Sequence, residues 1–345
     1  MPELEDPSVK ILKQLKKAGN QYVSGEELSN TLGMSRTAIW KRIDSIKEEG
    51  FNVEAVTNKG YRLIKGDDSC GIDAPYGRLA VLSEVTGLVL GQNFKFLKET
   101  DSTNTVLKKM AAKGAPEGTV VLADVQSAGR GRRGRTWMSA PKMGIWMSIL
   151  LRPNLHPSSV QTLTLAASVA VMKALEPMEI EGLGIKWPND ILINQKKVCG
   201  ILTELSAEAE KVDWVVLGIG LNVNHSESDF SNDIADIATS LRMNVNKNTE
   251  LNRSEIAANI LNEMEKVYQS FIEKGSSWVV DEWRKRNVTL GKMVDIISQT
   301  GSFRAKVLDI TADGKLIVKD ADNKVHEVLS GEISLREAEN WNNNI

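Results

Sequence analysis

The pattern of apolar residues changes twice along this chain, and these changes restrict its fold more than any other feature. Up to about residue 65, apolar side chains recur at helical spacing and then alternate in two short strands. From about residue 80, short apolar strands are mixed with helical stretches, and from about residue 285 short alternating strands follow. Because 345 residues exceed one ordinary core, we expect each pattern to form a separate folding unit.

The first unit shows three helix patterns, each with its own start or stop signal. Ser24, with Glu27 three residues later, forms a capping box at the start of the second helix. Ser35 can cap the third helix, and residues 51–64 indicate two short strands around a turn at Asn58. The apolar stripes are Ile11, Leu12, Leu15 and Ala18, then Leu28 and Leu32, then Ile39, Ile43 and Ile46. Three helices and a hairpin predict a winged helix-turn-helix.

The third helix of this unit carries a basic outer face. Thr37 and Lys41 lie opposite the isoleucine stripe on a helical wheel, and Arg36, Trp40 and Lys47 flank it. These side chains suit phosphates and base edges in a major groove, so we predict DNA binding. The alternatives are a small helical domain with a solvated basic face, or a protein-docking module.

The middle of the chain mixes strands and helices. This mixture indicates a mixed sheet flanked by helices. The expected strands are residues 94–99, 118–126, 144–153 and 213–224, with a hairpin at 191–206 and helices at 101–114 and 158–178.

Between two of these strands lies an arginine-rich loop, "QSAGRGRRGRTW" at residues 126–137. Arg130, Arg132, Arg133 and Arg135 are separated by glycines, which let backbone amides approach an anion while the arginines supply forked donors. The P-loop pattern is absent, and four arginines would crowd the helix start of a dinucleotide fingerprint. We expect a site where a carboxylate and a nucleoside triphosphate react; the alternative is a flexible basic surface loop.

A second polar stretch, "KWPNDILINQKKVCGILTE" at residues 186–204, supports this site. Lys186 and Lys197 bracket a hairpin, and Asn189 and Asp190 place polar groups in an apolar run. Pro-Asn-Asp is also ordinary turn chemistry, but a plain turn leaves Trp187 and the two lysines unexplained.

Near the C-terminus, strands are expected at residues 292–298, 301–310, 314–320 and 324–335, with a turn at Asp313–Gly314. This pattern predicts a small SH3-like β-barrel.

Composition excludes several other classes of protein. Cys70 and Cys199 are far apart and the three histidines are scattered, which argues against a zinc site or a disulfide framework and fits a reducing cytoplasm. A formal net charge of −2 means that any nucleic-acid surface must be local. We see no signal peptide and expect no membrane span.

Several motifs together resemble those of biotin protein ligases, in the same order and spacing. With its helix-turn-helix, the chain resembles the bifunctional ligases that also repress biotin genes, over about residues 8–330. The motifs are "ETDSTN" (99–104), "QSAGRGRRGRTW" (126–137), "KWPND" (186–190), "KKVCGILTE" (196–204) and "GIGLNVN" (218–224).

The resemblance implies an α+β multidomain fold. Its parts are an N-terminal winged helix-turn-helix, a central mixed-sheet α/β ligase domain of the class II synthetase-like type, and a C-terminal SH3-like barrel. With our own pattern analysis, the expected division is residues 1–65 for DNA binding, a linker at 66–79, the catalytic domain at 80–284 and the C-terminal domain at 285–335.

The resemblance also implies the chemistry. The family uses ATP with Mg²⁺ to convert biotin to biotinyl-5′-AMP, then transfers biotin to a lysine of the biotin carboxyl carrier domain of acetyl-CoA carboxylase or a related carboxylase. It further implies that the protein forms a homodimer when the adenylate is bound, and that this dimer binds operator DNA and represses transcription of biotin genes.

Site residues carry over motif by motif. Those matching the biotin-binding positions are Ser102, Thr103, Asn104, Gln126, Arg130, Gly131, Arg132 and Lys197. Those matching the ATP-binding positions are Arg130, Arg132, Trp137, Lys186, Asn189 and Asn222. We nominate Arg132 and Lys197 to neutralise developing phosphate charge and Asp190 to orient the attacking lysine amine, and assign no metal-binding side chain.

Two other functions fit the same residues. The alternatives to a ligase that also represses are a ligand-sensing transcription factor whose core binds biotin without chemistry, and a lipoate or other acyl ligase on the same fold. Biotin-dependent exchange between ATP and pyrophosphate would decide the first question, and competition between biotin and lipoate the second.

Overall fold

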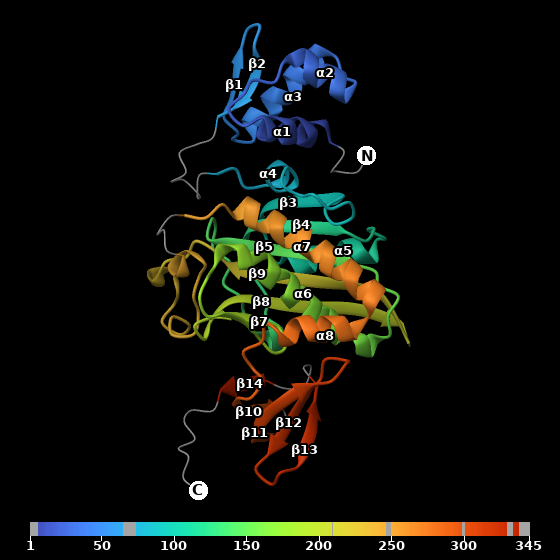
Figure 1. The fold of residues 1–345 in the computed structure, drawn as a ribbon, viewed down its shortest axis with the longest axis vertical. Helices are drawn as coiled ribbons and strands as arrows, with labels where there is room; N and C mark the ends of the chain where they lie inside the picture. Colours follow the sequence, from blue (N-terminus) through green and yellow to red (C-terminus); the bar gives the residue numbers. More distant parts are fainter. Residues whose placement is uncertain are drawn as a thin grey trace.

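The computed structural model describes residues 6–64, 74–208, 210–245, 250–298, 301–329 and 334–337. Figure 1 shows three bodies stacked along the long axis: a helical unit with a hairpin, a central sheet covered by helices, and a small sheet. The expected fold class is thereby confirmed. Residues 65–73, most of the predicted linker, lie outside the described residues.

The N-terminal unit is the expected winged helix-turn-helix. Its elements are α1 (Pro7–Ala18), α2 (Gly25–Leu32), α3 (Arg36–Glu48), β1 (Val53–Val56) and β2 (Gly60–Leu63). Ser24 Oγ accepts the backbone N–H of Glu27 at 3.0 Å, and Ser35 Oγ accepts that of Ala38 at 3.2 Å. The predicted caps therefore start α2 and α3. Ile39, Ile43 and Ile46 are buried, which leaves the opposite face of α3 in solvent.

The central sheet is mixed. Within the described residues its strand order is β3-β4-β5-β9-β8-β7-β6. β3 and β4 are parallel and the other neighbours are antiparallel. The strands are β3 (Asn93–Thr100), β4 (Thr119–Gln126), β5 (Gly144–Leu151), β6 (Leu183–Lys186), β7 (Asp190–Ile193), β8 (Lys196–Glu208) and β9 (Lys211–Asn222).

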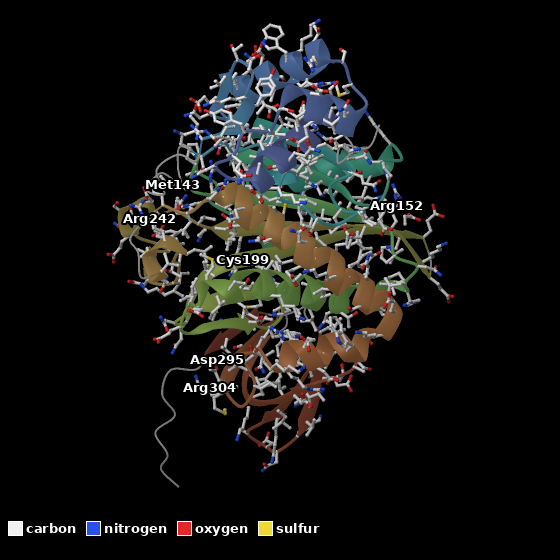
Figure 2. The ribbon with its side chains drawn as sticks, turned by 45° about the horizontal axis from the view of Figure 1, so that its top comes forward. Met143, Arg152, Cys199, Arg242, Asp295 and Arg304 are labelled. Carbon is white, nitrogen blue, oxygen red and sulfur yellow. The ribbon has the colours of Figure 1, made fainter. Side chains whose placement is uncertain are left out.

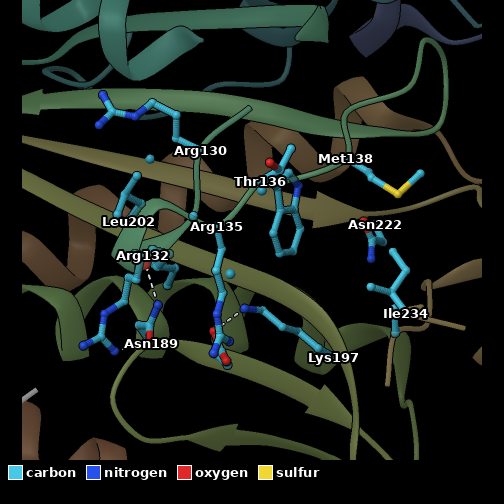
Figure 3. A pocket seen from close by; sticks show the side chains of 18 of the residues that line it. Arg130, Arg132, Arg135, Thr136, Met138, Asn189, Lys197, Leu202, Asn222 and Ile234 are labelled. Atoms are coloured by element: carbon cyan, nitrogen blue, oxygen red, sulfur yellow. Dashed lines mark hydrogen bonds and ion pairs between the residues drawn. The ribbon is translucent and has the colours of Figure 1, made fainter. Parts of the chain in front are cut away.

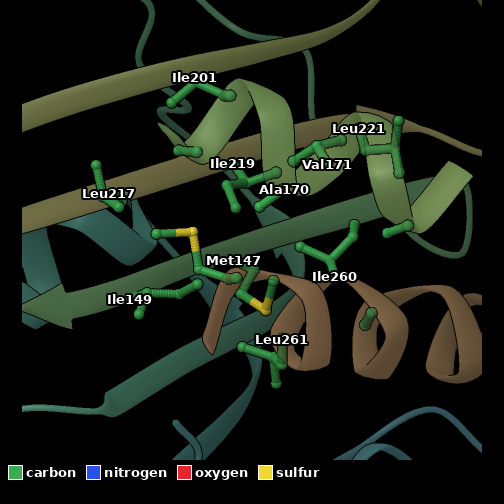
Figure 4. Packing of buried hydrophobic residues seen from close by; sticks show 14 of the residues in the cluster. Met147, Ile149, Ala170, Val171, Ile201, Leu217, Ile219, Leu221, Ile260 and Leu261 are labelled. Carbon is green, nitrogen blue, oxygen red and sulfur yellow. The ribbon is translucent and has the colours of Figure 1, made fainter. Parts of the chain in front are cut away.

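Helices cover both faces of this sheet. α6 (Val160–Leu175) and α7 (Arg253–Lys274) pack on one face, where Figure 4 shows Met147, Ile219 and Leu261 meeting in the core. α5 (Thr103–Ala112) packs on the other face against β4, β5 and β9. In the part of the chain that the structure describes, the other helices are α4 (Arg78–Leu82), α8 (Ser276–Arg284) and the short 3-10 turns Arg132–Gly134, Pro157–Ser159, Glu176–Met178, Glu227–Asp229 and Arg242–Asn244.

Strand β5 lies at the centre of this core. All its residues from Gly144 to Leu151 are buried, because helices cover both of its faces. Met143 and Arg152 flank the strand at opposite ends (Figure 2). The guanidinium of Arg152 donates to the carbonyls of Ala111 and Ala115 and so closes the end remote from Met143.

The long helix expected at residues 158–178 is present as α6 and lies in the core. The segment Pro157–Met178, which contains α6, is by length and composition alone apolar enough to cross a membrane. In the structure most of it is buried between the sheet and its neighbouring helices, which is typical of a core helix.

The C-terminal unit is a small antiparallel sheet, as expected for an SH3-like barrel. Its strands, in the order β13-β12-β11-β10-β14, are β10 (Met293–Ser298), β11 (Gly301–Ile310), β12 (Leu316–Asp320), β13 (Val325–Val328) and β14 (Ser334–Glu337). Gly314, at φ 82°, forms the predicted turn. Arg304 and Asp295 pair across β10 and β11 at 2.8 Å. Figure 2 labels both residues next to each other on this sheet. Residues 330–333 of the last predicted strand lie outside the described residues.

Polar contacts join the three bodies. Arg78 in α4 pairs with Asp6 at 2.8 Å, and Lys16 in α1 pairs with Glu84. At the other end, the indole N–H of Trp187 donates to the carbonyl of Gly314 at 3.0 Å. Trp187, which a plain turn at residues 188–190 did not explain, therefore connects the small sheet to the central sheet.

Candidate functional site

A cavity of about 810 Å³ opens over the central sheet, on the face that carries α5. Its walls are the arginine-rich loop, the ends of β4 to β9 and the segment 225–238. All the residues predicted to contact small-molecule ligands line it: Ser102, Thr103, Asn104, Gln126, Arg130, Gly131, Arg132, Trp137, Lys186, Asn189, Asp190, Lys197 and Asn222. The individual roles assigned to them stay predictions.

One end of the cavity is built from neutral polar groups at the start of α5. Gln126 Oε1 accepts the backbone N–H of Thr103 at 2.9 Å and lies 3.1 Å from its hydroxyl oxygen. The amide of Asn104 donates to Glu204 at 2.9 Å. Ser102, Thr103 and Asn104 are each at most 4% exposed, so this end offers buried donors and acceptors to a compact polar group.

The arginine-rich loop folds into a tight turn above the sheet. Gly131 N–H donates to the carbonyl of Arg135 at 2.7 Å, and Trp137 N–H donates to that of Gly129 at 2.9 Å. Arg133 adopts a positive φ of 56° within the turn. A Cβ on Gly129 would lie 2.3 Å from the carbonyl oxygen of Trp137, so a larger residue would force the turn apart.

The other end of the cavity gathers charge. Lys197 Nζ lies 2.6 Å from Asp190 Oδ1, and Arg132 donates to Asn189 Oδ1 at 3.0 Å. Figure 3 shows the bond between Arg132 and Asn189, with Arg130 pointing away from Arg132 and Arg135. Burial lowers the pKa of Arg132, Asp190 opposes this, and the charges of Arg133 and Arg135 lower it further. Crowded cations of this kind favour a bound anion.

Trp137 lies against a floor of glycines between these two ends. A Cβ on Gly200 or Gly220, which face each other across β8 and β9, would come within 2.9 or 2.6 Å of its ring. Lys197 Nζ lies 5.1 Å from the ring centroid. Among the described residues, the indole N–H has no hydrogen-bond partner. The ring is thus placed to stack against a planar group in the cavity.

Sequence reasoning missed the wall formed by residues 225–238. The backbone of Lys197 holds this segment, because its N–H donates to Ile237 at 2.7 Å and its carbonyl accepts from Thr239 at 2.9 Å. Phe230, Ile234 and Ile237 face the cavity from it. Their only sequence signal is three apolar side chains in an otherwise polar stretch.

His225 in the same wall is also new. Its ring stacks on Phe230 with centroids 5.1 Å apart, and it is 3% exposed. Burial lowers its pKa to about 4, although the charge of Asp229 opposes this change. The imidazole is therefore neutral at physiological pH.

Asn222 and Lys186 frame the cavity from the sheet. The Asn222 amide donates to the carbonyl of Thr239 at 3.0 Å and is 6% exposed. Lys186 ends β6 opposite Asp190. Both are held by regular pairing or by a hydrogen bond, so their positions depend on the sheet.

The predicted DNA-contacting side chains lie far from this cavity, on α3. Arg36, Thr37, Trp40, Lys41 and Lys47 are all exposed, and Trp40 is 54% exposed. Arg36 pairs with Glu26 at 2.7 Å, but such an exposed pair contributes little stability and is easily exchanged for a phosphate.

Comparison with known proteins agrees with this arrangement. A model of the biotin/lipoate A/B protein ligase family matches residues 96–222, an HTH domain model matches 9–62, and a biotin protein ligase C terminal domain model matches 289–336.

Two curated relatives cover nearly the whole chain. The bifunctional ligase/repressor BirA of Bacillus subtilis (strain 168) is 38% identical over 94% of this chain and 97% of its own length. The protein of the same name from Escherichia coli (strain K12) is 29% identical over 93% and 95%. A solved structure, the biotin protein ligase of Aquifex aeolicus in complex with biotin and ATP, is 31% identical with a TM-score of 0.61, covering 71% of this chain and 99% of that one.

Proposed function

Because this chain belongs to the biotin protein ligase family, we propose that it activates biotin with ATP and transfers it to a carrier-domain lysine, and that its winged helix represses biotin genes. One observation carries the proposal: a single cavity joins a neutral polar end at Asn104 to a cationic end at Arg132 and Lys197. This arrangement suits a ligand that has a polar ring at one end and a reacting carboxylate at the other.

The substrates follow the chemistry of the walls. The ureido ring of biotin, which has both N–H donors and a carbonyl acceptor, lies among Ser102, Thr103, Asn104 and Gln126. Its carboxylate reaches Arg132 and Lys197. Adenine stacks on Trp137 near Asn222, with Ile234 and Ile237 excluding water from its other side.

Activation joins two anions. A carboxylate oxygen of biotin attacks the α-phosphorus of ATP, the bond to the bridging oxygen breaks, and pyrophosphate leaves. Arg132 and Lys197 neutralise the oxygens on which negative charge develops, so they stabilise the transition state more than the ground state. The product, biotinyl-5′-AMP, is a mixed anhydride, and the arginine-rich loop shields it from water.

Transfer needs an unprotonated acceptor amine. That amine attacks the acyl carbon, an amide forms, AMP leaves and the amine gives up a proton. Asp190, which lies 2.6 Å from Lys197 here, exchanges this partner for the amine once Lys197 binds the adenylate phosphate. We assign Asp190 the orientation of the amine for this reason.

Mg²⁺ accompanies the triphosphate. Bound there, it supplies positive charge to the phosphate oxygens. No group of three or more His, Cys, Asp or Glu side chains suited to a metal occurs in the described residues. During activation, before the acceptor amine arrives, Asp190 would hold the ion as a single carboxylate ligand beside the triphosphate oxygens.

Repression requires two reading heads, so we propose a homodimer with the adenylate as corepressor. A single α3 offers few phosphate contacts, and paired heads suit a two-fold operator. β8 extends to Glu208, well past Gly200, its last partner on β7, so its outer half has an open edge. This edge adjoins the arginine-rich loop, because Arg130 lies 3.5 Å from Glu204. Joining two such edges places the interface beside the adenylate.

The proposal also covers the location of the protein, its acceptors and its domain boundaries. We propose a cytoplasmic protein whose acceptors are carrier domains of acetyl-CoA carboxylase and related carboxylases, with the domain division 1–65, 66–79, 80–284 and 285–335. A relative from Mycobacterium tuberculosis is named as a biotin–[acetyl-CoA-carboxylase] ligase at 32% identity, which supports the acceptor class.

Exchange of radioactive pyrophosphate into ATP tests the function. We expect exchange that depends on biotin and is not supported by lipoate. Exchange driven equally by lipoate would favour the acyl-ligase alternative, and biotin binding without exchange would favour a ligand sensor.

A further inference from the structure

A buried polar network behind Asn104 carries an inference that rests on the proposed function. Ser148 is fully buried in β5, where every other side chain is apolar or absent. Its hydroxyl oxygen lies 2.6 Å from Asn104 Oδ1 and 2.7 Å from Thr103 Oγ1. Glu204 in β8 meets the same asparagine from the other side.

The carboxylate of Glu204 fixes the orientation of the Asn104 side-chain amide. It accepts from Asn104 Nδ2 at 2.9 Å and from Lys108 Nζ at 2.6 Å. Burial acts to raise the pKa of Glu204, but hydrogen bonds from Lys108 and Asn104 and nearby positive charge bring it below its ordinary value. An ionised carboxylate only accepts hydrogen bonds, so it must face the NH₂ group of Asn104. The amide oxygen then faces Ser148.

The hydroxyl of Ser148 completes the orientation. It has one proton, and Asn104 Oδ1 can only accept, so this proton goes to Asn104. The hydroxyl proton of Thr103 then goes either to a lone pair of Ser148, whose oxygen is 2.7 Å away, or to Gln126 Oε1, which is 3.1 Å away. In either case the oxygen of Thr103 keeps lone pairs to offer. The network therefore makes both Asn104 Oδ1 and Thr103 Oγ1 hydrogen-bond acceptors.

We propose that Ser148 and Glu204 are positioning residues that make this end of the cavity select a ring with N–H donors, which is the ureido ring of biotin. Neither side chain is among the residues predicted to touch biotin; both act through Asn104 and Thr103. Gly218 supports the arrangement, because a Cβ there would lie 2.2 Å from Asn104 Oδ1 and displace the amide.

Binding measurements on two variants test the proposal. In Glu204→Gln, the new amide can present NH₂ to Asn104 and let its amide turn over; Ser148→Ala removes the hydroxyl donor. We expect the Kd for biotin to rise about tenfold in each, the usual effect of one misplaced buried hydrogen bond. The kcat of exchange at saturating biotin should stay within about threefold, because the reacting carboxylate lies at the other end of the cavity.

A second ligand separates orientation from general damage. Biotin methylated on either ureido nitrogen lacks one N–H donor, so wild-type protein should bind at least one methylated form far more weakly than biotin. In both variants the ratio of the two Kd values should fall several-fold, since the acceptor that reads this N–H is no longer held. Ser168→Ala, which removes another buried hydroxyl remote from the cavity, is the matched control and should leave both Kd values unchanged.

The outcomes are distinct. An unchanged biotin Kd, or an unchanged ratio with both ligands weakened equally, overturns the proposal for these residues. If Ser148→Ala does not fold, as judged by thermal unfolding, Glu204→Gln decides alone. Failure of the wild-type protein to bind biotin overturns the proposed function instead.

Discussion

At the scale of single residues, the reacting end of the cavity depends on how cations are held before an anion arrives. Lys197 is paired with Asp190 and Arg132 with Asn189, so each is preorganised by an oxygen that a phosphate can replace. Arg132 is also crowded by Arg133 and Arg135, which lower its pKa after burial has done so. A bound anion relieves this repulsion, and the preorganisation avoids reorganising the site during the reaction.

Removing either cation should therefore slow adenylate formation. We expect Arg132→Ala and Lys197→Ala each to reduce the exchange rate by about 10²–10³-fold, as for loss of one preorganised donor. Lys95→Ala, which removes an exposed charge from β3 outside the cavity, serves as the control. Exchange at near-normal rates in both cavity variants would show that these cations do not act on the phosphate.

His225 predicts a dependence of stability on pH. Its pKa is about 4 in the folded protein, against an ordinary 6.5, because burial disfavours the charged ring. Above pH 6.5 the ring is neutral in both states. Between pH 6.5 and pH 4 the unfolded chain binds a proton at this ring and the folded protein does not. The free energy of unfolding therefore decreases as the pH is lowered through this range, by roughly 3 kcal/mol in total.

The variant His225→Phe keeps the stacking on Phe230 and removes this titration. Denaturant unfolding at pH 7 and pH 4 should show a smaller loss of stability for the variant than for the wild type. Parallel losses in the two proteins would mean that His225 titrates normally. The comparison of variants cancels the carboxylates that titrate in the same range.

At the scale of elements, the arginine-rich loop is a turn closed by its own backbone against the repulsion of four guanidiniums. Two of its closing hydrogen bonds are Gly131 to Arg135 and Trp137 to Gly129. Few buried contacts support it, because Arg130, Arg133 and Arg135 are exposed and Arg132 is only partly buried. Such a segment opens easily unless a ligand adds contacts.

Limited proteolysis should report this opening. We expect trypsin to cleave within residues 127–136 in the free protein and to cleave far more slowly once biotinyl-5′-AMP is bound. Cleavage at Lys113, in an exposed turn after α5, provides an internal reference that the adenylate should not change. Equal protection in both states would mean that the loop is permanently ordered.

The elements also show what sequence can predict. Caps and apolar stripes located α1 to α3 and α5, and short apolar runs located β3, β4, β5, β8 and β9, because these signals are local. α7 has an Asn252 cap and a Gly275 stop, yet we did not identify it from sequence.

The cavity residues also fall into those with a local sequence signal and those without one. Motif residues were predicted because polar side chains stand out in apolar strands, as Asn189 does. Ser148 and the wall at 225–238 were missed, because their roles arise from contacts between distant segments. Trp187 could not be explained without its partner Gly314, more than a hundred residues away.

At the scale of the whole molecule, the cavity and the proposed dimer interface lie on one sheet. The cavity lies over β8 and β9, and the open half of β8 continues from it to Leu205, which is 41% exposed. In the dimer that we propose, a ligand that orders the neighbouring loop would favour pairing of these edges, and by linkage operator DNA would favour the liganded dimer to the same degree.

Charge on the open edge should separate the two activities. We expect Leu205→Arg to abolish adenylate-induced dimerisation in sedimentation and to weaken operator binding, while exchange stays near wild type. Val325→Arg on the small sheet, where the apolar side chain is 55% exposed, is the matched control. A variant that still dimerises with the adenylate would exclude this edge as the interface.

Deleting residues 1–65 tests the division between the bodies. We expect operator binding to be lost and ligation to a carrier domain to stay largely intact, because no residue lining the cavity belongs to that segment. Loss of ligation would mean that docking of the N-terminal winged helix-turn-helix on α4 is needed for catalysis.

Two ion pairs join the N-terminal winged helix-turn-helix to the central body, and they affect how operator binding should be interpreted at different salt concentrations. Arg78 with Asp6, and Lys16 with Glu84, are only partly buried, so added salt weakens them together with the contacts to phosphates. A plot of log affinity against log salt is normally converted to a number of displaced counterions and hence of phosphate contacts. We expect the docked arrangement to be the form that binds the operator, so here the slope also contains the loss of docking at high salt. Counting phosphates from it will overestimate how many the winged helix touches.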